Sequence, residues 1–184
     1  MTYEEIKKIL ASGKYRLIAI DGHCASGKTT LGDRLHDELG GNLFHMDDFY
    51  LPWALKTEER MKEPGGNVDY ERFDREVLQH LLNREDFSYR CFDCGTQSLK
   101  EPVSVTDSEI NIIEGSYAMH PSLIDDYDLK IYVKCDEKTR LRRIEMRDPE
   151  KYEDFVKMWI PLENIYFDTC KIEEKADLVY ATDE

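Results

Sequence analysis

Short, mostly apolar runs alternate along the chain with longer segments in which apolar residues recur every three or four positions. The runs lie at 17–20, 43–46, 110–113, 129–133 and 176–180. Continuous apolar runs of this length are typical of parallel strands that are buried on both faces. Strands that alternate with helices predict an α/β fold, a parallel sheet with helices on both of its faces.

Helices are indicated between these runs by apolar residues on one side of each segment. Thr2 and Glu5 form a capping-box pattern at the start of a first helix, and a second helix covers 28–38 and ends before Gly40. A helical region at 136–174 is expected to be interrupted by Pro149. The apolar face of a further helix comprises Phe73, Val77, Leu78, Leu81 and Leu82.

Two segments lack a clear helix or strand period. Residues 52–69 contain two prolines, Gly65-Gly66 and many charges, which predicts a long loop. Residues 87–106 alternate irregularly, which is typical of a hairpin.

Composition narrows the class of protein. A chain of 184 residues is one domain's length, and its net charge of -14 would repel nucleic acid or an anionic membrane. No apolar run approaches the roughly 20 residues of a membrane span, and the first residues lack the features of an export signal. We therefore expect a cytoplasmic protein; a homo-oligomer is left open.

Five cysteines stand at positions 24, 91, 94, 135 and 170, an odd number that favours free thiols over a disulfide framework. Cys91 and Cys94 form a C-x-x-C pair, but no second pair follows at the spacing of zinc ligands.

Residues 22–29, GHCASGKT, match the phosphate-binding pattern G-x-x-x-x-G-K-[ST] at every fixed position and lie between an apolar strand and an amphipathic helix. In this motif, loop N–H groups surround phosphate oxygens, Lys28 reaches the terminal phosphates and the Thr29 hydroxyl binds magnesium. A nucleoside triphosphate, ATP or GTP, and Mg²⁺ are therefore the expected cofactors. The predicted binding residues are Gly22, Ala25, Ser26, Gly27, Lys28, Thr29 and Thr30.

Two acidic residues follow apolar strands, at the edge of the sheet to which the loop also belongs. Glu114 ends its strand as a Walker B acid does and is predicted to position magnesium; a cap or loop acid is the alternative. Asp47 has the chemistry of a general base for an acceptor hydroxyl, with a helix N-cap or a solvated turn as the alternative. Asp48 is left outside the site.

Seven segments resemble, in order and approximate spacing, the uridine kinase-like branch of the P-loop kinases, which also contains the nicotinamide riboside kinases. They are GHCASGKTT, MDDFYLP, GNVDYERFD, IIEGSYAMHPSL, YDLKIYV, TRLRRIEMRD and KADLVY. The resemblance covers nearly the whole chain. It implies a P-loop NTPase fold in one domain, 1–184, with a five-stranded parallel sheet, an acceptor-binding insert at about 50–105 and an arginine-bearing lid at about 140–160.

The resemblance also implies ATP as donor, a ribose 5′-hydroxyl as acceptor, and Asp47 as the base. It places Tyr50 near the acceptor's ring, where ordinary packing is an equal alternative. It places Asp69 on the ribose hydroxyls, since a carboxylate can accept a hydrogen bond from each of two hydroxyls. From the sequence alone, Asp69 is equally well explained as the N-cap of the next helix.

Arg140, Arg143 and Arg147 lie three and four residues apart, on one face of a helix that resembles the family's lid. We expect them to neutralise charge on the phosphates, Arg140 in nucleotide binding and the other two in catalysis; an exposed basic face is the alternative. Uridine kinases read the pyrimidine edge with a tyrosine and a histidine in the hairpin. Here Phe92, or Tyr89, and Gln97 stand at the corresponding places.

The predicted function is an ATP-dependent kinase for the 5′-hydroxyl of a ribonucleoside, with uridine or cytidine as the leading acceptor. One alternative is a kinase for another hydroxylated metabolite, such as nicotinamide riboside, pantothenate or a sugar acid. The alternative outside this class is a nucleotide-dependent regulatory switch. A GTPase would need an N/T-K-x-D element to read guanine, and the chain contains none.

Overall fold

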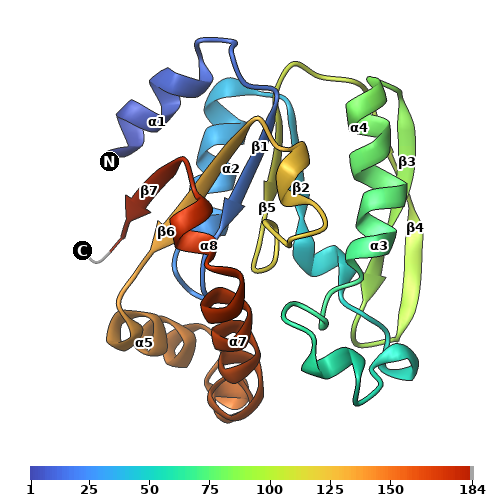
Figure 1. Ribbon diagram of the computed structural model, residues 1–184, viewed down its shortest axis with the longest axis vertical. Helices are drawn as coiled ribbons and strands as arrows, with labels where there is room; N and C mark the ends of the chain where they lie inside the picture. Colours follow the sequence, from blue (N-terminus) through green and yellow to red (C-terminus); the bar gives the residue numbers. More distant parts are fainter. Residues whose placement is uncertain (183–184) are drawn as a thin grey trace.

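A five-stranded parallel sheet forms the centre of the protein (Figure 1), and the computed structural model describes residues 1–182. The strands lie in the order β2-β5-β1-β6-β7, and every neighbouring pair is parallel. Their bounds are β1 Leu17–Asp21, β2 Asn42–His45, β5 Asn111–Glu114, β6 Leu129–Lys134 and β7 Leu178–Ala181. The predicted sheet is confirmed, with strand ends shifted by one or two residues.

Helices cover both faces of this sheet because the side chains of β1 alternate between two buried clusters. Ile18 and Ile20 pack with α1 (Tyr3–Leu10) and α2 (Lys28–Leu39). Leu17 and Ala19 belong to the opposite cluster, to which α7 (Ile160–Cys170) and α8 (Ile172–Lys175) contribute. A strand buried on both sides reads as a continuous apolar run, which is why the sequence pattern located it.

The predicted capping box is present at the start of α1. Thr2 Oγ1 accepts a hydrogen bond from Glu5 N at 3.3 Å, and Glu5 Oε2 accepts one from Thr2 N at 2.8 Å. The helix has a strongly apolar side that packs on the sheet.

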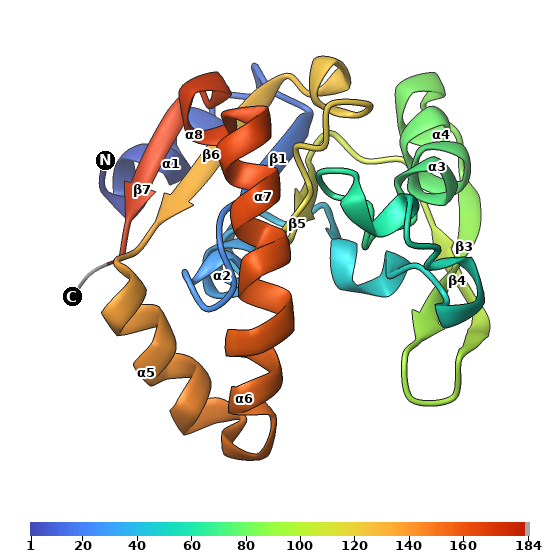
Figure 2. The same cartoon turned by 60° about the horizontal axis from the view of Figure 1, so that its bottom comes forward.

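Residues 46–110 leave the sheet after β2 and return before β5; they include the segment 50–105, called the insert, whose binding of an acceptor stays a prediction (Figure 2). The insert contains α3 (Tyr70–Phe73) and α4 (Gln79–Asn83), joined through a π-type turn, and the antiparallel hairpin of β3 (Phe87–Asp93) and β4 (Ser98–Val105). Within 52–69 only two short 3-10 turns form, which confirms the predicted loop. The antiparallel pairing of β3 with β4 confirms the predicted hairpin. Leu82 is 38% exposed, whereas its neighbour Leu81 is buried, so Leu82 points away from the buried face of the helix that was predicted to include it.

The helical region predicted at 136–174 is divided where expected. α5 (Glu137–Arg147) ends before Pro149, which opens a 3-10 turn, and α6 (Tyr152–Asp154) continues through a π-type turn at 155–159 into α7. Figure 2 shows α5 and the α6–α7 stretch converging below the carboxyl edge of the sheet, on the other side from the insert. Among the described residues, every helix is too short or too polar to cross a membrane.

Candidate active site

The loop between β1 and α2 has backbone conformations that require glycine. Gly27 has φ of 103°, in the left-handed region, and a Cβ at Gly22 would lie 2.4 Å from the carbonyl oxygen of Val133. Ala25 also adopts a positive φ of 58°. The loop therefore curls closely against the sheet and opens at the N-terminus of α2, where N–H groups can bind phosphate oxygens.

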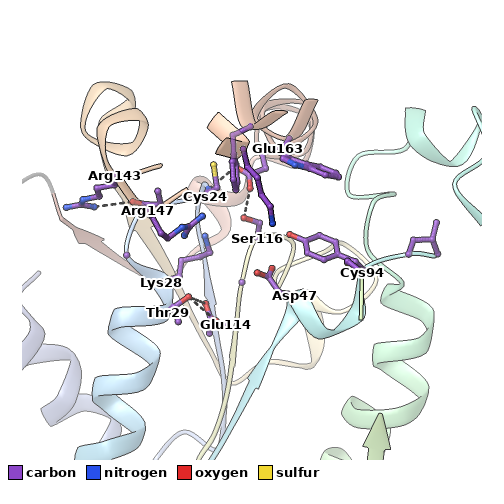
Figure 3. A pocket seen from close by; sticks show the side chains of 18 of the residues that line it. Cys24, Lys28, Thr29, Asp47, Cys94, Glu114, Ser116, Arg143, Arg147 and Glu163 are labelled. Atoms are coloured by element: carbon purple, nitrogen blue, oxygen red, sulfur yellow. Dashed lines mark hydrogen bonds between the residues drawn. The ribbon is translucent and has the colours of Figure 1, made fainter. Parts of the chain in front are cut away.

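Lys28 and Thr29 begin α2 at the floor of this loop. Lys28 is buried, and its Nζ donates to the carbonyl oxygen of His23 at 2.9 Å. The Thr29 hydroxyl lies 3.2 Å from both carboxylate oxygens of Glu114, which ends β5 (Figure 3). A hydroxyl beside a carboxylate supplies the oxygen ligands that Mg²⁺ prefers, so these residues fit the expected ion.

His45, the last residue of β2, contacts the same carboxylate. Its Nδ1 lies 2.6 Å from Glu114 Oε1, and this hydrogen bond raises the pKa of His45. No sequence motif indicated this contact; it arises because His45 and Glu114 are paired neighbours on β2 and β5.

Asp47 lies in a 3-10 turn, Met46–Phe49, directly after β2. Its carboxyl points into the cleft toward Lys28 and Glu114 (Figure 3). The side chain is open to the cleft, yet the surrounding protein displaces water and raises the pKa of Asp47, an effect that Lys28 opposes. A raised pKa makes a carboxylate a better proton acceptor, which suits a general base.

A cleft of about 470 Å³ joins the phosphate-binding loop to Asp47 and to the insert. Its volume suits a small molecule. Insert residues Tyr50, Trp53, Lys56 and Gln97 line one side, and Arg147, Phe155 and Trp159 line the side formed by α5 and the 155–159 turn.

The three arginines of α5 that were predicted to contact the phosphates, Arg140, Arg143 and Arg147, are not placed alike. Arg147 is exposed at the cleft, whereas Arg143 donates to the carbonyl oxygens of Ala25 at 3.2 Å and Thr182 at 2.6 Å. Arg140 is buried outside the cleft lining, and no described residue offers an acceptor to its Nε or Nη1. Because two helical turns separate 140 from 147, a shared face does not mean a shared site. The roles in phosphate binding stay predictions.

Asp69 caps α3: its Oδ1 accepts from Arg72 N at 3.1 Å, and its Oδ2 lies 3.6 Å from Arg72 Nε. The N-cap alternative is therefore confirmed. Asp69 is not part of the cleft lining, so its contact with a ribose stays a prediction.

The three acceptor residues predicted from the resemblance also differ in placement. Tyr50 lines the cleft, with its ring centre 6.5 Å from that of Trp159. Gln97 lines it too, but its Oε1 accepts from Trp53 N at 3.0 Å and its Nε2 donates to the carbonyl oxygen of Cys94 at 2.7 Å. Phe92 is 6% exposed and lies outside the lining, a position that does not support its predicted contact with an acceptor.

The sequence reasoning missed a buried acid that ties α7 to the loop. Glu163 Oε2 accepts from Cys24 N at 2.8 Å, and its Oε1 accepts from the Ser116 hydroxyl at 2.7 Å (Figure 3). A single glutamate in a helix carries no local signal of such a contact.

Asp21, at the end of β1, supports the loop from below. Its carboxylate accepts hydrogen bonds from Gly22 N, Met119 N and the Tyr166 hydroxyl, yet complete burial raises the pKa of Asp21 to about 6. All five cysteines are free thiols, and among residues 1–182 no cluster of three or more His, Cys, Asp or Glu side chains could hold a metal ion.

Known proteins with similar sequences include uridine kinases and uridine-cytidine kinases. The uridine kinase of Clostridium botulinum (strain Okra / Type B1) is 32% identical over 143 residues, which cover 72% of this chain and 68% of that one. Uridine-cytidine kinase B of Dictyostelium discoideum is 31% identical over 159 residues, 80% of this chain and 64% of that one. A chloroplastic uridine/cytidine kinase of Arabidopsis thaliana is 29% identical over 163 residues, 77% of this chain but 33% of that protein. The chain thus spans between a third and two thirds of the length of the Arabidopsis and Dictyostelium relatives.

Among solved structures, a possible uridine kinase from Bacillus stearothermophilus matches with a TM-score of 0.69 at 24% identity, over 97% of this chain and 96% of that one. This likeness supports the fold. Comparison with protein-family models gives no match.

Proposed function

Because the chain belongs to the uridine kinase family, we propose that it transfers the terminal phosphate of ATP to the 5′-hydroxyl of a ribonucleoside, with uridine or cytidine as acceptor. The observation that carries this proposal is the position of Asp47, whose carboxyl faces Lys28 and Thr29 across one continuous cleft. The space between them can hold a sugar hydroxyl beside a triphosphate.

The donor would lie on the loop. Backbone N–H groups of 22–29 and the Lys28 ammonium bind the phosphates, and Arg147 approaches them from α5. Thr29 and Glu114 would hold Mg²⁺, which offsets the negative charge of the triphosphate when bound. Glu163 keeps the loop and α7 together through Cys24 N.

The acceptor would lie on the insert side. Asp47 accepts the proton of the attacking hydroxyl while the hydroxyl oxygen bonds to the terminal phosphorus. The bond between that phosphorus and the bridging oxygen breaks, and the bridging oxygen leaves with ADP. Tyr50 and Trp159 supply aromatic surface beside this point. The contact of Asp69 with the ribose hydroxyls stays a prediction, because Asp69 lies outside the cleft lining.

The test is a phosphorylation screen of nucleosides and other ribosides with ATP and Mg²⁺, repeated with Asp47→Asn. We expect a pyrimidine ribonucleoside to be the best acceptor, and the variant to lose about 10²- to 10⁴-fold in kcat because the proton acceptor is gone. ATP affinity, measured in parallel, should change little. Asp48→Asn, on the neighbouring residue, is the control and should retain activity.

Full activity of Asp47→Asn on the best acceptor would refute the assignment of the base. ATP turnover that does not depend on any acceptor would refute the kinase itself and favour a nucleotide-dependent switch.

A further inference from the structure

We propose that Lys56 sets which acceptor ring this kinase takes: its ammonium group favours a neutral ring that presents carbonyl oxygens and disfavours a cationic ring. The inference rests on the proposed function and deepens it by naming a residue that determines the class of acceptor.

Lys56 lies in the loop of the insert and lines the cleft that also contains Asp47. Its Nζ is 4.6 Å from the ring centre of Trp53 and 5.4 Å from that of Trp159. Trp53 belongs to the insert and Trp159 to the turn before α7, so two separate elements hold the ammonium between their indole rings. Cation–π attraction favours this arrangement.

The protein uses only part of the hydrogen-bonding capacity of this ammonium. Its Nζ donates to Asn67 Oδ1 at 2.7 Å, and an ammonium has three N–H donors. Asn67 is neutral and 3% exposed, which fixes the lysine without cancelling its charge. The ammonium therefore keeps donors for a ligand in the cleft.

The charge of Lys56 also lacks an acidic partner. The chain has 39 acidic and 25 basic side chains, yet within residues 1–182 none of the acids forms an ion pair with Lys56. Burial lowers the pKa of Lys56, the direction expected when desolvation is not offset by a neighbouring carboxylate. Lys56 is thus a cation without an acidic partner beside a ligand cleft, in a protein with many acids. This is explained if the ligand supplies the hydrogen-bond acceptors for its ammonium.

The surroundings define the ring that fits. Tyr50, Trp53 and Trp159 give the cleft aromatic surface that suits a planar ring, and the Lys56 ammonium lies on the same lining with donors that the protein does not use. A ring carbonyl can accept an N–H from Lys56. A pyridinium ring would instead place a second positive charge near the first, where water screens poorly. Uridine matches this chemistry, whereas nicotinamide riboside does not.

The competing explanation is mechanical: Lys56 could do no more than hold Trp53 to Trp159 across the cleft. In that case its removal would weaken every acceptor alike. The two explanations differ in the ratio between a neutral and a cationic acceptor, which is the quantity to measure.

The experiment compares wild type with Lys56→Met, which keeps side-chain length without charge, and with Lys56→Arg, which keeps the charge. Lys62→Met is the matched control, because Lys62 has a side chain that is 72% exposed on the same loop. The acceptors are uridine and nicotinamide riboside, each measured by kcat and KM. Binding is measured separately, without ATP, by tryptophan fluorescence, since the two tryptophans of the chain flank Lys56.

We expect Lys56→Met to raise KM and Kd for uridine about tenfold, the loss of one charge-assisted hydrogen bond, with kcat changed less than about twofold. KM and Kd for nicotinamide riboside should stay the same or fall. Lys56→Arg should retain most of the preference, and Lys62→Met all of it. Equal losses for the two acceptors would overturn the inference in favour of the mechanical role.

The binding measurement separates this inference from the proposed function. If wild type binds uridine but transfers no phosphate, the proposed kinase activity fails, and the ratio of the two Kd values still decides the role of Lys56. If uridine binds no better than nicotinamide riboside to wild type, the inference fails whatever the activity.

Discussion

The two sides of the cleft are built in different ways. On the side proposed to bind the donor, called the donor side, the loop 22–29 is held by backbone conformations and by the sheet: glycine is needed against Val133, and Thr29 lies beside Glu114 because β1 and β5 are neighbours. On the side proposed to bind the acceptor, called the acceptor side, the insert lines the cleft with loop residues that side-chain hydrogen bonds hold in place, such as those from Trp53 N to Gln97 and from Lys56 to Asn67.

This difference teaches where the protein can vary. Geometry that rests on the backbone has few alternatives, so a change there should affect the proposed reaction with every acceptor. Geometry that rests on side chains of loop residues can be adjusted one contact at a time, so changes there should alter which acceptor is used.

The largest effect should come from the donor side. Lys28→Met removes the ammonium beside the phosphates, and we expect kcat/KM to fall about 10³-fold for every acceptor. The ratio between acceptors should stay constant, as steady-state kinetics with two nucleosides would show. Lys8→Met, an exposed lysine on α1, is the control. A changed acceptor ratio in Lys28→Met would contradict the proposed separation of the two sides.

An intermediate effect, on stability, is expected where the insert contacts the segment that follows β5. His120, which follows β5, stacks on Tyr70 of the insert with ring centres 3.8 Å apart, and burial lowers the pKa of His120 to about 4. The unfolded chain, with an ordinary histidine pKa near 6.5, binds more protons between about pH 4 and 6.5. Stability should therefore fall as pH decreases through this window.

Two other groups also make stability depend on pH in this range. Burial lowers the pKa of His23 to about 4, which acts in the same direction as His120, and raises the pKa of Asp21 to about 6, which acts in the opposite direction. Substitution of His120 alone separates its contribution from theirs. When the pH falls from about 7.5 to about 5, the free energy of unfolding, measured by urea denaturation, should decrease in both proteins. The decrease should be smaller in His120→Gln than in wild type by roughly 2 kcal/mol. His80→Gln, with a side chain 40% exposed, should behave as wild type does. An unchanged pH dependence in His120→Gln would show that His120 does not sense pH.

The smallest effect is predicted on the acceptor side. Gln97→Ala removes the acceptor for Trp53 N and the donor to the Cys94 carbonyl, so the Trp53 segment loses its anchor. We expect KM for the nucleoside to rise about fivefold, near 1 kcal/mol, with KM for ATP unchanged. The other glutamine, Gln79, is exposed on α4, and Gln79→Ala should leave both constants unchanged. An equal rise in KM for ATP would contradict the assignment of Gln97 to the acceptor side.

Local patterns located the helices and strands of the sheet and the loop 22–29 well. The capping box at Thr2, the strand runs of the sheet and the motif at 22–29 depend on neighbouring residues, and each was found where the pattern indicated. The same patterns could not place Arg140 and Arg143. Their spacing fixed a helical face, but the packing of α5 against the loop decided that one is buried and that the other binds loop carbonyls.

What the amino-acid sequence determined by itself is the order of elements, the phosphate-binding loop and the acids that end strands, because these depend on short-range spacing and on the fixed direction of parallel strands. Only the tertiary structure brought Glu163 to Cys24, His45 to Glu114, and Lys56 between two tryptophans. These contacts join residues that are far apart in the chain or lie in irregular loops, and their distances follow from how helices and loops pack.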